Sequence, residues 1–171
     1  MYVIGIIFVW VVTGFFLLNK EYIHQAYTTV QYYILLNLVY NFLYYDYVLW
    51  SYKGKSLSFL NHTFIELAFT FIVMPIAITI FIGYFPNHLF PAVMYVLAWS
   101  VCFTALEWVS SLWDMFVYDH GWSLFHSFWF NLLMFTMLIV HFKRPFIAII
   151  LSVPLALVLI WLFPFPLSSL N

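Results

Sequence analysis

The sequence predicts an all-helical integral membrane protein, a bundle of six transmembrane helices with five as the alternative. Composition is the first reason. Of 171 residues, 67% are hydrophobic and only 6% are charged, whereas about a quarter of the residues in soluble proteins are charged. The second reason is a set of six apolar windows, each near the ~20 residues with which a helix crosses a bilayer. They cover about 2–18, 30–50, 63–84, 91–113, 124–141 and 146–163.

Each window is expected to be a helix, because runs of this length lack the alternating pattern of a membrane β-barrel. The first window has no basic region before it and no small-residue cleavage motif, so we expect a retained helix rather than a signal peptide. Pro154 interrupts the last window, but proline is tolerated in membrane helices. Trp50 and Trp122 lie near predicted helix ends, where aromatic rings anchor helices at the membrane interface. No stretch is long enough for a second domain, so residues 1–171 are expected to form a single transmembrane domain.

Six spans would place both termini on one side of the membrane. That side carries Lys53 and Lys55, and the opposite side carries Lys20, Lys143 and Arg144. Because cytoplasmic loops carry an excess of Lys and Arg, this balance favours termini outside the cell.

A polar stripe runs along the fourth window. Its members repeat at helical spacing, so at about 100° per residue they point one way: Ser100, Thr104, Glu107, Ser111 and Asp114. A charged group inside a membrane segment costs roughly 2.5–3.5 kcal/mol and normally faces the interior of the bundle. The stripe is therefore expected to face other helices rather than lipid.

Similar polar faces occur on three further windows. The second carries Asn37, Asn41 and Tyr44, the third His62, Glu66 and Thr70, and the fifth Ser127, Asn131 and His141 with His126 beside them. Together with the stripe on the fourth window, these faces predict that the second to fifth helices pack around a polar interior. The asparagines and serines are also the residue types that join membrane helices by hydrogen bonds, so their role is predicted to be largely structural.

Several titratable residues fall toward the membrane side shared with the termini, and they are the candidate site. The predicted cation-binding residues are Glu66, Glu107, Asp46, Asn41 and Asn131, with His62, His126 and His120 as candidate metal ligands. Carboxylates suit hard ions and imidazole suits transition metals, and both groups can relay protons. We expect Asp46, Glu66 and Glu107 to share one interior space, with a histidine near at least one carboxylate. The alternative is that Glu66 and Glu107 are satisfied by His62 or His126 without any ligand.

A weak internal repeat is also present. The segment 46–50 ends the second window as 107–113 ends the fourth, and each is followed by a loop and a window that opens near a histidine. Helices two–three and four–five would then be parallel repeats about an axis along the membrane normal, as in some transporters.

Ordered motifs across about residues 30–150 resemble those of an uncharacterised family. They are Tyr40-Asn41-Phe42-Leu43, Leu49-Trp50, Asn61-His62-Thr63, Glu107-Trp108, His120-Gly121-Trp122, Phe130-Asn131 and His141-Phe142-Lys143 with Pro145. The family comprises small multi-span membrane proteins of spore-forming Gram-positive bacteria. The resemblance implies a helical membrane fold in a bacterial plasma membrane, but no site residues, because the family has no established activity.

Three classes of function fit these patterns. The leading hypothesis is a non-enzymatic membrane protein that binds or transports a small cation, a metal ion or a proton. The second is a membrane-embedded metalloenzyme that acts on a lipid-like substrate, and the third is a sensory or assembly partner without a ligand. A divalent metal ion is the possible cofactor, and the expected partners are lipids, a second copy or another membrane protein. The net charge of −1 gives nucleic acid no electrostatic support.

Overall fold

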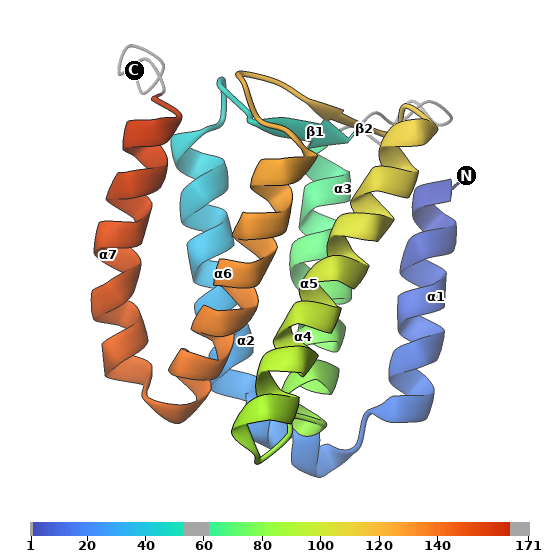
Figure 1. Ribbon diagram of the computed structural model, residues 1–171. Helices are drawn as coiled ribbons and strands as arrows, with labels where there is room; N and C mark the ends of the chain where they lie inside the picture. The colour runs from blue at the N-terminus through green and yellow to red at the C-terminus, as the bar shows by residue number, and fades with distance from the viewer. Residues whose placement is uncertain (1, 53–61, 165–171) are drawn as a thin grey trace.

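The computed structural model describes residues 2–52 and 62–164, which form a single helical bundle (Figure 1). In chain order the elements are α1 (Tyr2–Leu17), α2 (Lys20–Leu43), β1 (Trp50–Tyr52), α3 (His62–Ala68), η1 (Phe69–Val73), α4 (Met74–Gly83), α5 (Leu89–Leu112), β2 (Phe116–Tyr118), α6 (Leu124–Lys143) and α7 (Pro145–Leu162). Because α3, the π-helix η1 and α4 run on without a break, the described chain has the six helical rods that the sequence predicts.

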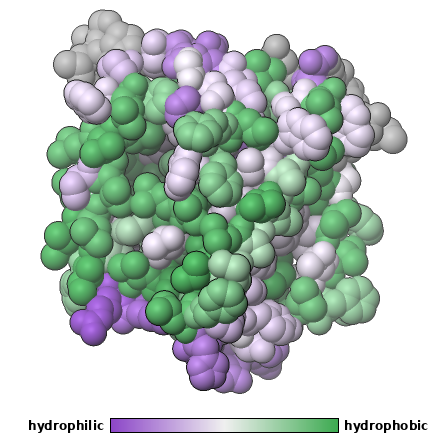
Figure 2. Space-filling model, in the orientation of Figure 1, coloured by the Kyte–Doolittle hydropathy of each residue, from purple (hydrophilic) through white to green (hydrophobic). Residues whose placement is uncertain are grey.

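Four of the described rods are long and apolar enough to cross a membrane. They are Thr63–Gly83, Leu89–Leu112, Leu124–Lys143 and Pro145–Leu162. Of the other two, α1 is apolar but has only 16 residues. The remaining rod, α2, has 24 residues, about 36 Å at 1.5 Å per residue, and is more polar. Figure 2 shows a hydrophobic band around the middle of the visible face, with hydrophilic residues gathered at both ends.

The boundaries predicted for the second helix were wrong at both ends. It begins at Lys20 because Asn19 caps it, its Oδ1 accepting the N–H of Tyr22 at 2.8 Å, and an asparagine N-cap is strongly preferred. It ends at Leu43, after which the chain turns through Tyr44 and Tyr47 into a strand.

A short antiparallel ribbon, which the sequence analysis did not predict, closes one end of the bundle (Figure 1). Strand β1 pairs with β2 in the register Trp50 with Tyr118, Ser51 with Val117 and Tyr52 with Phe116. Beyond the ribbon, the N–H of Asp119 donates to the carbonyl of Leu49 at 2.9 Å. Helix α1 begins, and α7 ends, at this same end of the molecule (Figure 1), which we call the ribbon end.

Two helix–strand–helix units, of the kind that the predicted internal repeat requires, follow one another in the chain. The most extensive helix packing is of α2 on α4 and of α5 on α6, and each pair is connected through one strand of the ribbon. Two strands related by a twofold axis along the bundle run antiparallel, as β1 and β2 do. The chain thus contains two consecutive helix–strand–helix units, and their relation as parallel repeats stays a prediction.

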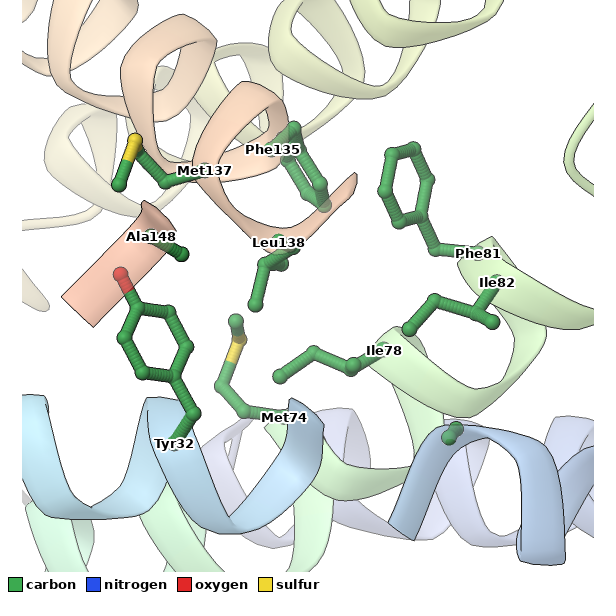
Figure 3. Close-up of a cluster of buried hydrophobic side chains, with 10 residues drawn as sticks. Tyr32, Met74, Ile78, Phe81, Ile82, Phe135, Met137, Leu138 and Ala148 are labelled. Carbon is green, nitrogen blue, oxygen red and sulfur yellow. The ribbon is translucent and has the colours of Figure 1, made fainter. Parts of the chain in front are cut away.

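The main apolar core lies in the half of the bundle away from the ribbon. Figure 3 shows side chains from α2, α4, α6 and α7 converging there, among them Met74, Ile78, Phe81, Phe135 and Leu138, which are all buried. Aromatic rings of α5 extend this core, since Trp99 lies 5.5 Å from Phe81 and 5.7 Å from Phe135 between ring centroids. This half also contains two polar pairs, Thr29 with His141 and Tyr32 with Ser152.

Candidate functional site

Glu107 is a residue of α5 that faces α6 and the ribbon. Two consecutive hydrogen bonds connect it to Ser127 and Trp122. The indole Nε1–H of Trp122 donates to Ser127 Oγ at 2.8 Å. The Ser127 hydroxyl donates in turn to Glu107 Oε1. Tyr118 of β2 lies close by, and burial followed by the neighbouring Glu107 carboxylate raises the pKa of Tyr118. Glu107 therefore faces a neighbouring helix, as its stripe predicts.

The rest of the stripe has a structural role. The hydroxyls of Ser100, Thr104 and Ser111 donate to backbone carbonyls of their own helix. Thr104 Oγ1 also accepts from Asn131 Nδ2 at 3.1 Å, which joins α5 to α6. Asp114 departs from the expected pattern, because α5 ends at Leu112 and Asp114 lies exposed in the following turn with a φ of 52°.

Glu66 lies on α3 and has different surroundings. Its side chain is half-buried, and its carboxylate is within electrostatic range of Tyr33 and Tyr40 on α2. Among the residues that the structure describes, none donates a hydrogen bond to this carboxylate. The π-helix η1 begins three residues later, at Phe69.

A chain of hydrogen bonds fixes the backbone around Glu66. Asn41 Nδ2 donates to the carbonyl of Asn37 at 2.9 Å. Asn37 Nδ2 donates to Thr70 Oγ1 at 2.7 Å, and the Thr70 hydroxyl donates to the backbone carbonyl of Glu66 at 2.7 Å. The polar face of α2 thus holds the α3–η1 rod at the turn that carries Glu66. Asn37 forms this interhelical bond, while Asn41 bonds only within its own helix.

The predicted carboxylate–histidine cluster is not assembled by the described residues. Asp46 is exposed in the turn after α2 and does not share an interior space with Glu66 and Glu107. His126 Nδ1 is 2.8 Å from Ser123 Oγ, and His120 Nδ1 is 3.0 Å from the carbonyl of Val48. No group of three or more His, Cys, Asp or Glu side chains in the described part of the chain could hold a metal ion.

The physical reason for this difference is local. The expectation for Asp46 assumed a helix running to residue 50, but α2 ends at Leu43. His120 lies in a left-handed turn with φ of 50° and is followed by Gly121 with φ of 81°, so it is held against the ribbon rather than on a helix face. The side chain of His62 lies outside the described residues, and the prediction for it stays a prediction.

An aromatic cluster at the ribbon end was missed. The Trp50 ring stacks on Tyr40 with centroids 4.8 Å apart and an interplanar angle of 9°. It also lies 5.0 Å from Trp122, which is only 6% exposed. Both tryptophans were interpreted as interfacial anchors, because a helical period cannot reveal that a loop strand folds back over the bundle.

Glu66 and Glu107 flank this cluster from different sides. Tyr40 connects the Trp50 ring to the surroundings of Glu66, and Trp122 connects it through Ser127 to Glu107. The two carboxylates therefore have separate partners. No family model, curated protein or solved structure matches the chain in sequence or structural comparisons.

Proposed function

We propose that this chain is a six-span protein of a bacterial plasma membrane that binds or transports a small cation at Glu66. The observation that carries the proposal is a half-buried carboxylate, inside the apolar rod Thr63–Gly83, to which no described residue donates a hydrogen bond. Ionisable groups within apolar membrane segments are costly and are generally retained for ion or proton pathways. The placement in a bacterial membrane rests on the family resemblance.

The number of spans is supported by the course of α1 and α2. Both run the height of the bundle beside the four apolar rods (Figure 1). The polar residue Asn37 of α2 is directed to the interior through its hydrogen bond to Thr70. The 16 residues of α1 reach about 24 Å, and a bilayer thins locally around a short helix at modest cost.

The π-helix η1 is the second support. Such one-turn insertions are rare in proteins, and those that occur often lie at functional sites. Here the insertion follows Glu66 by one turn and includes Thr70, which connects Glu66 to α2. A local change of pitch at this point sets the direction of the carboxylate relative to the tyrosines of α2.

Glu107 is assigned a structural role instead, since Ser127 and Trp122 already form a hydrogen-bonded relay to it. The metalloenzyme hypothesis lacks structural support, because no group of three His, Cys, Asp or Glu side chains among the described residues could hold a metal ion. The assembly hypothesis is the second candidate, because Asn37–Thr70 and Asn131–Thr104 specify helix pairing without any ligand.

The test compares Glu66→Gln with the matched variant Glu107→Gln in purified protein in detergent. Thermal unfolding is measured across alkali, alkaline-earth and transition-metal ions and across pH. A ligand that binds the folded state stabilises it by RT ln(1 + [L]/Kd), so we expect a cation-dependent rise in Tm for wild type and Glu107→Gln. Glu66→Gln should fold and lose that rise. Equal rises in all three proteins would remove Glu66 from the site, and no rise in wild type would favour the assembly hypothesis.

A further inference from the structure

Two tyrosine hydroxyls are buried at the ribbon end without a hydrogen-bond partner. They belong to Tyr40 and Tyr118, and they are the described side chains in which this occurs. The Tyr40 hydroxyl lies near the backbone of Leu49, and the Tyr118 hydroxyl lies near Glu107 and Ser127, but none of these contacts has hydrogen-bonding geometry. Buried hydroxyls are nearly always partnered, so each of these calls for an explanation.

A ligand bound among the oxygen atoms around Glu66 would give the Tyr40 hydroxyl the partner that it lacks. On α2, Tyr33, Asn37 and Tyr40 fall at i, i+4 and i+7, so they share one face of the helix. The two tyrosines are within electrostatic range of Glu66. Asn37 is held beside the same rod through its Nδ2 bond to Thr70, which leaves its side-chain oxygen as an acceptor.

Resting on the proposed function, we propose that the cation at Glu66 is a hard monovalent ion of the sodium class, held through oxygen, with the Tyr40 hydroxyl oxygen as one of its ligands. Hydroxyl, amide and carboxylate oxygens suit hard cations, whereas transition metals favour imidazole and thiolate. Three described histidines have other partners: His120 lies against the Val48 carbonyl, His126 against Ser123 and His141 against Thr29.

Charge balance selects a monovalent ion. Glu66 is the single carboxylate within range of Tyr33 and Tyr40 among the described residues. One carboxylate neutralises one positive charge, and a divalent ion would leave a net charge in a partly buried site, which is costly without a further partner. The neutral hydroxyl and amide oxygens can replace part of the hydration shell of the ion without adding charge.

Tyr118 provides a matched control. Its hydroxyl is buried and unpartnered like that of Tyr40, but its neighbour is Glu107 rather than Glu66. Tyr32 provides a second control, because its hydroxyl is 2.6 Å from Ser152 Oγ. Substitution by Phe keeps the ring in all three positions, including the stacking of residue 40 on Trp50.

The experiment measures Tm and the apparent Kd for NaCl, with choline chloride replacing it at constant ionic strength. Wild type, Tyr40→Phe, Tyr118→Phe and Tyr32→Phe are compared, with MgCl2 and ZnCl2 as further arms. In choline chloride, Tyr40→Phe and Tyr118→Phe should be as stable as wild type or more stable, because each removes an unpartnered hydroxyl, whereas Tyr32→Phe should be less stable. In NaCl, Tyr40→Phe should bind sodium about tenfold more weakly or worse, as expected for a lost contact to a charged group. Tyr118→Phe should bind sodium like wild type.

The possible outcomes separate the two proposals. Sodium stabilisation that is unchanged in Tyr40→Phe overturns the ligand role of Tyr40. Stabilisation of wild type by ZnCl2, MgCl2 or protons but not by sodium overturns the sodium class, and leaves the proposed function intact provided that Glu66→Gln abolishes it. No stabilisation of wild type by any of these cations overturns the proposed function together with this inference.

Discussion

Replacing Ser127 by alanine should destabilise the protein more than any other single hydroxyl removal on α6. Ser127 is 4% exposed, and its oxygen receives the indole N–H of Trp122 while its hydrogen goes to Glu107. The variant therefore leaves a donor and an acceptor unpartnered at once. A hydrogen bond to a charged group contributes about 1.5–3 kcal/mol, and a buried group left unpaired costs about 1–3 kcal/mol. Since single interhelical bonds in membranes average only about 0.6 kcal/mol, we expect a net loss of about 2–3 kcal/mol.

The assay is reversible unfolding in mixed micelles, followed by tryptophan fluorescence. Ser110→Ala is the matched control, because the Ser110 hydroxyl bonds only to the carbonyl of Leu106 in its own helix, and its loss should change stability by less than about 0.5 kcal/mol. Glu107→Gln should retain most of the stability, since an amide oxygen can still accept from Ser127. A loss for Ser127→Ala no greater than that for Ser110→Ala would refute the relay and, with it, the structural role assigned to Glu107.

Two further predictions concern packing and topology. Gly83→Ala should destabilise the bundle by about 1–3 kcal/mol, because an added Cβ would lie 2.5 Å from Cγ of Tyr22. The control Gly5→Ala, whose added Cβ meets nothing within 4 Å, should be neutral or stabilising. Equal stabilities of the two variants in the same unfolding assay would contradict the contact between α2 and the end of α4. In a Cys102→Ser background, single cysteines at the exposed positions Asp46 and Asp119 should both react with an impermeant thiol reagent from outside the cell, and one at the exposed Asn87 should be protected until the membrane is opened. Opposite accessibility of positions 46 and 119 would mean that the chain between them crosses the membrane an odd number of times.

The helical rods could be predicted because their signal is long and one-dimensional. A run such as 91–113 is apolar over its whole length, and the structure places α5 at Leu89–Leu112. The polar stripe on that rod was expected to face other helices, and Thr104 and Glu107 do bond to Asn131 and Ser127 of α6. Periodicity is informative wherever one continuous helix presents one face to one neighbour.

The ribbon end could not be predicted in the same way, because it depends on chain segments that leave the helices. Asp46 shares the depth of the other candidate residues only if the second helix continues to residue 50, but α2 ends at Leu43. Cross-strand pairing of Trp50 with Tyr118 joins residues far apart in the chain, and three-residue strands are too short to show alternation. Of the histidines expected in a cluster, His126 lies against Ser123 three residues earlier and His120 lies against the Val48 carbonyl, so shared depth in the membrane did not bring these two together.

The two helix–strand–helix units offer a physical reason why the two carboxylates do not meet. Glu66 lies on the second rod of the first unit and interacts with tyrosines of α2, the first rod of the same unit. Glu107 lies on the first rod of the second unit and is bonded to α6, the second rod of that unit. Each carboxylate thus has its partners within its own unit, but only Glu107 receives a hydrogen bond from a described side chain. Ser127 and Trp122 thus hold Glu107 between α5 and α6, whereas no described residue donates to the Glu66 carboxylate, which is why the proposed cation site is placed at Glu66 and not at Glu107.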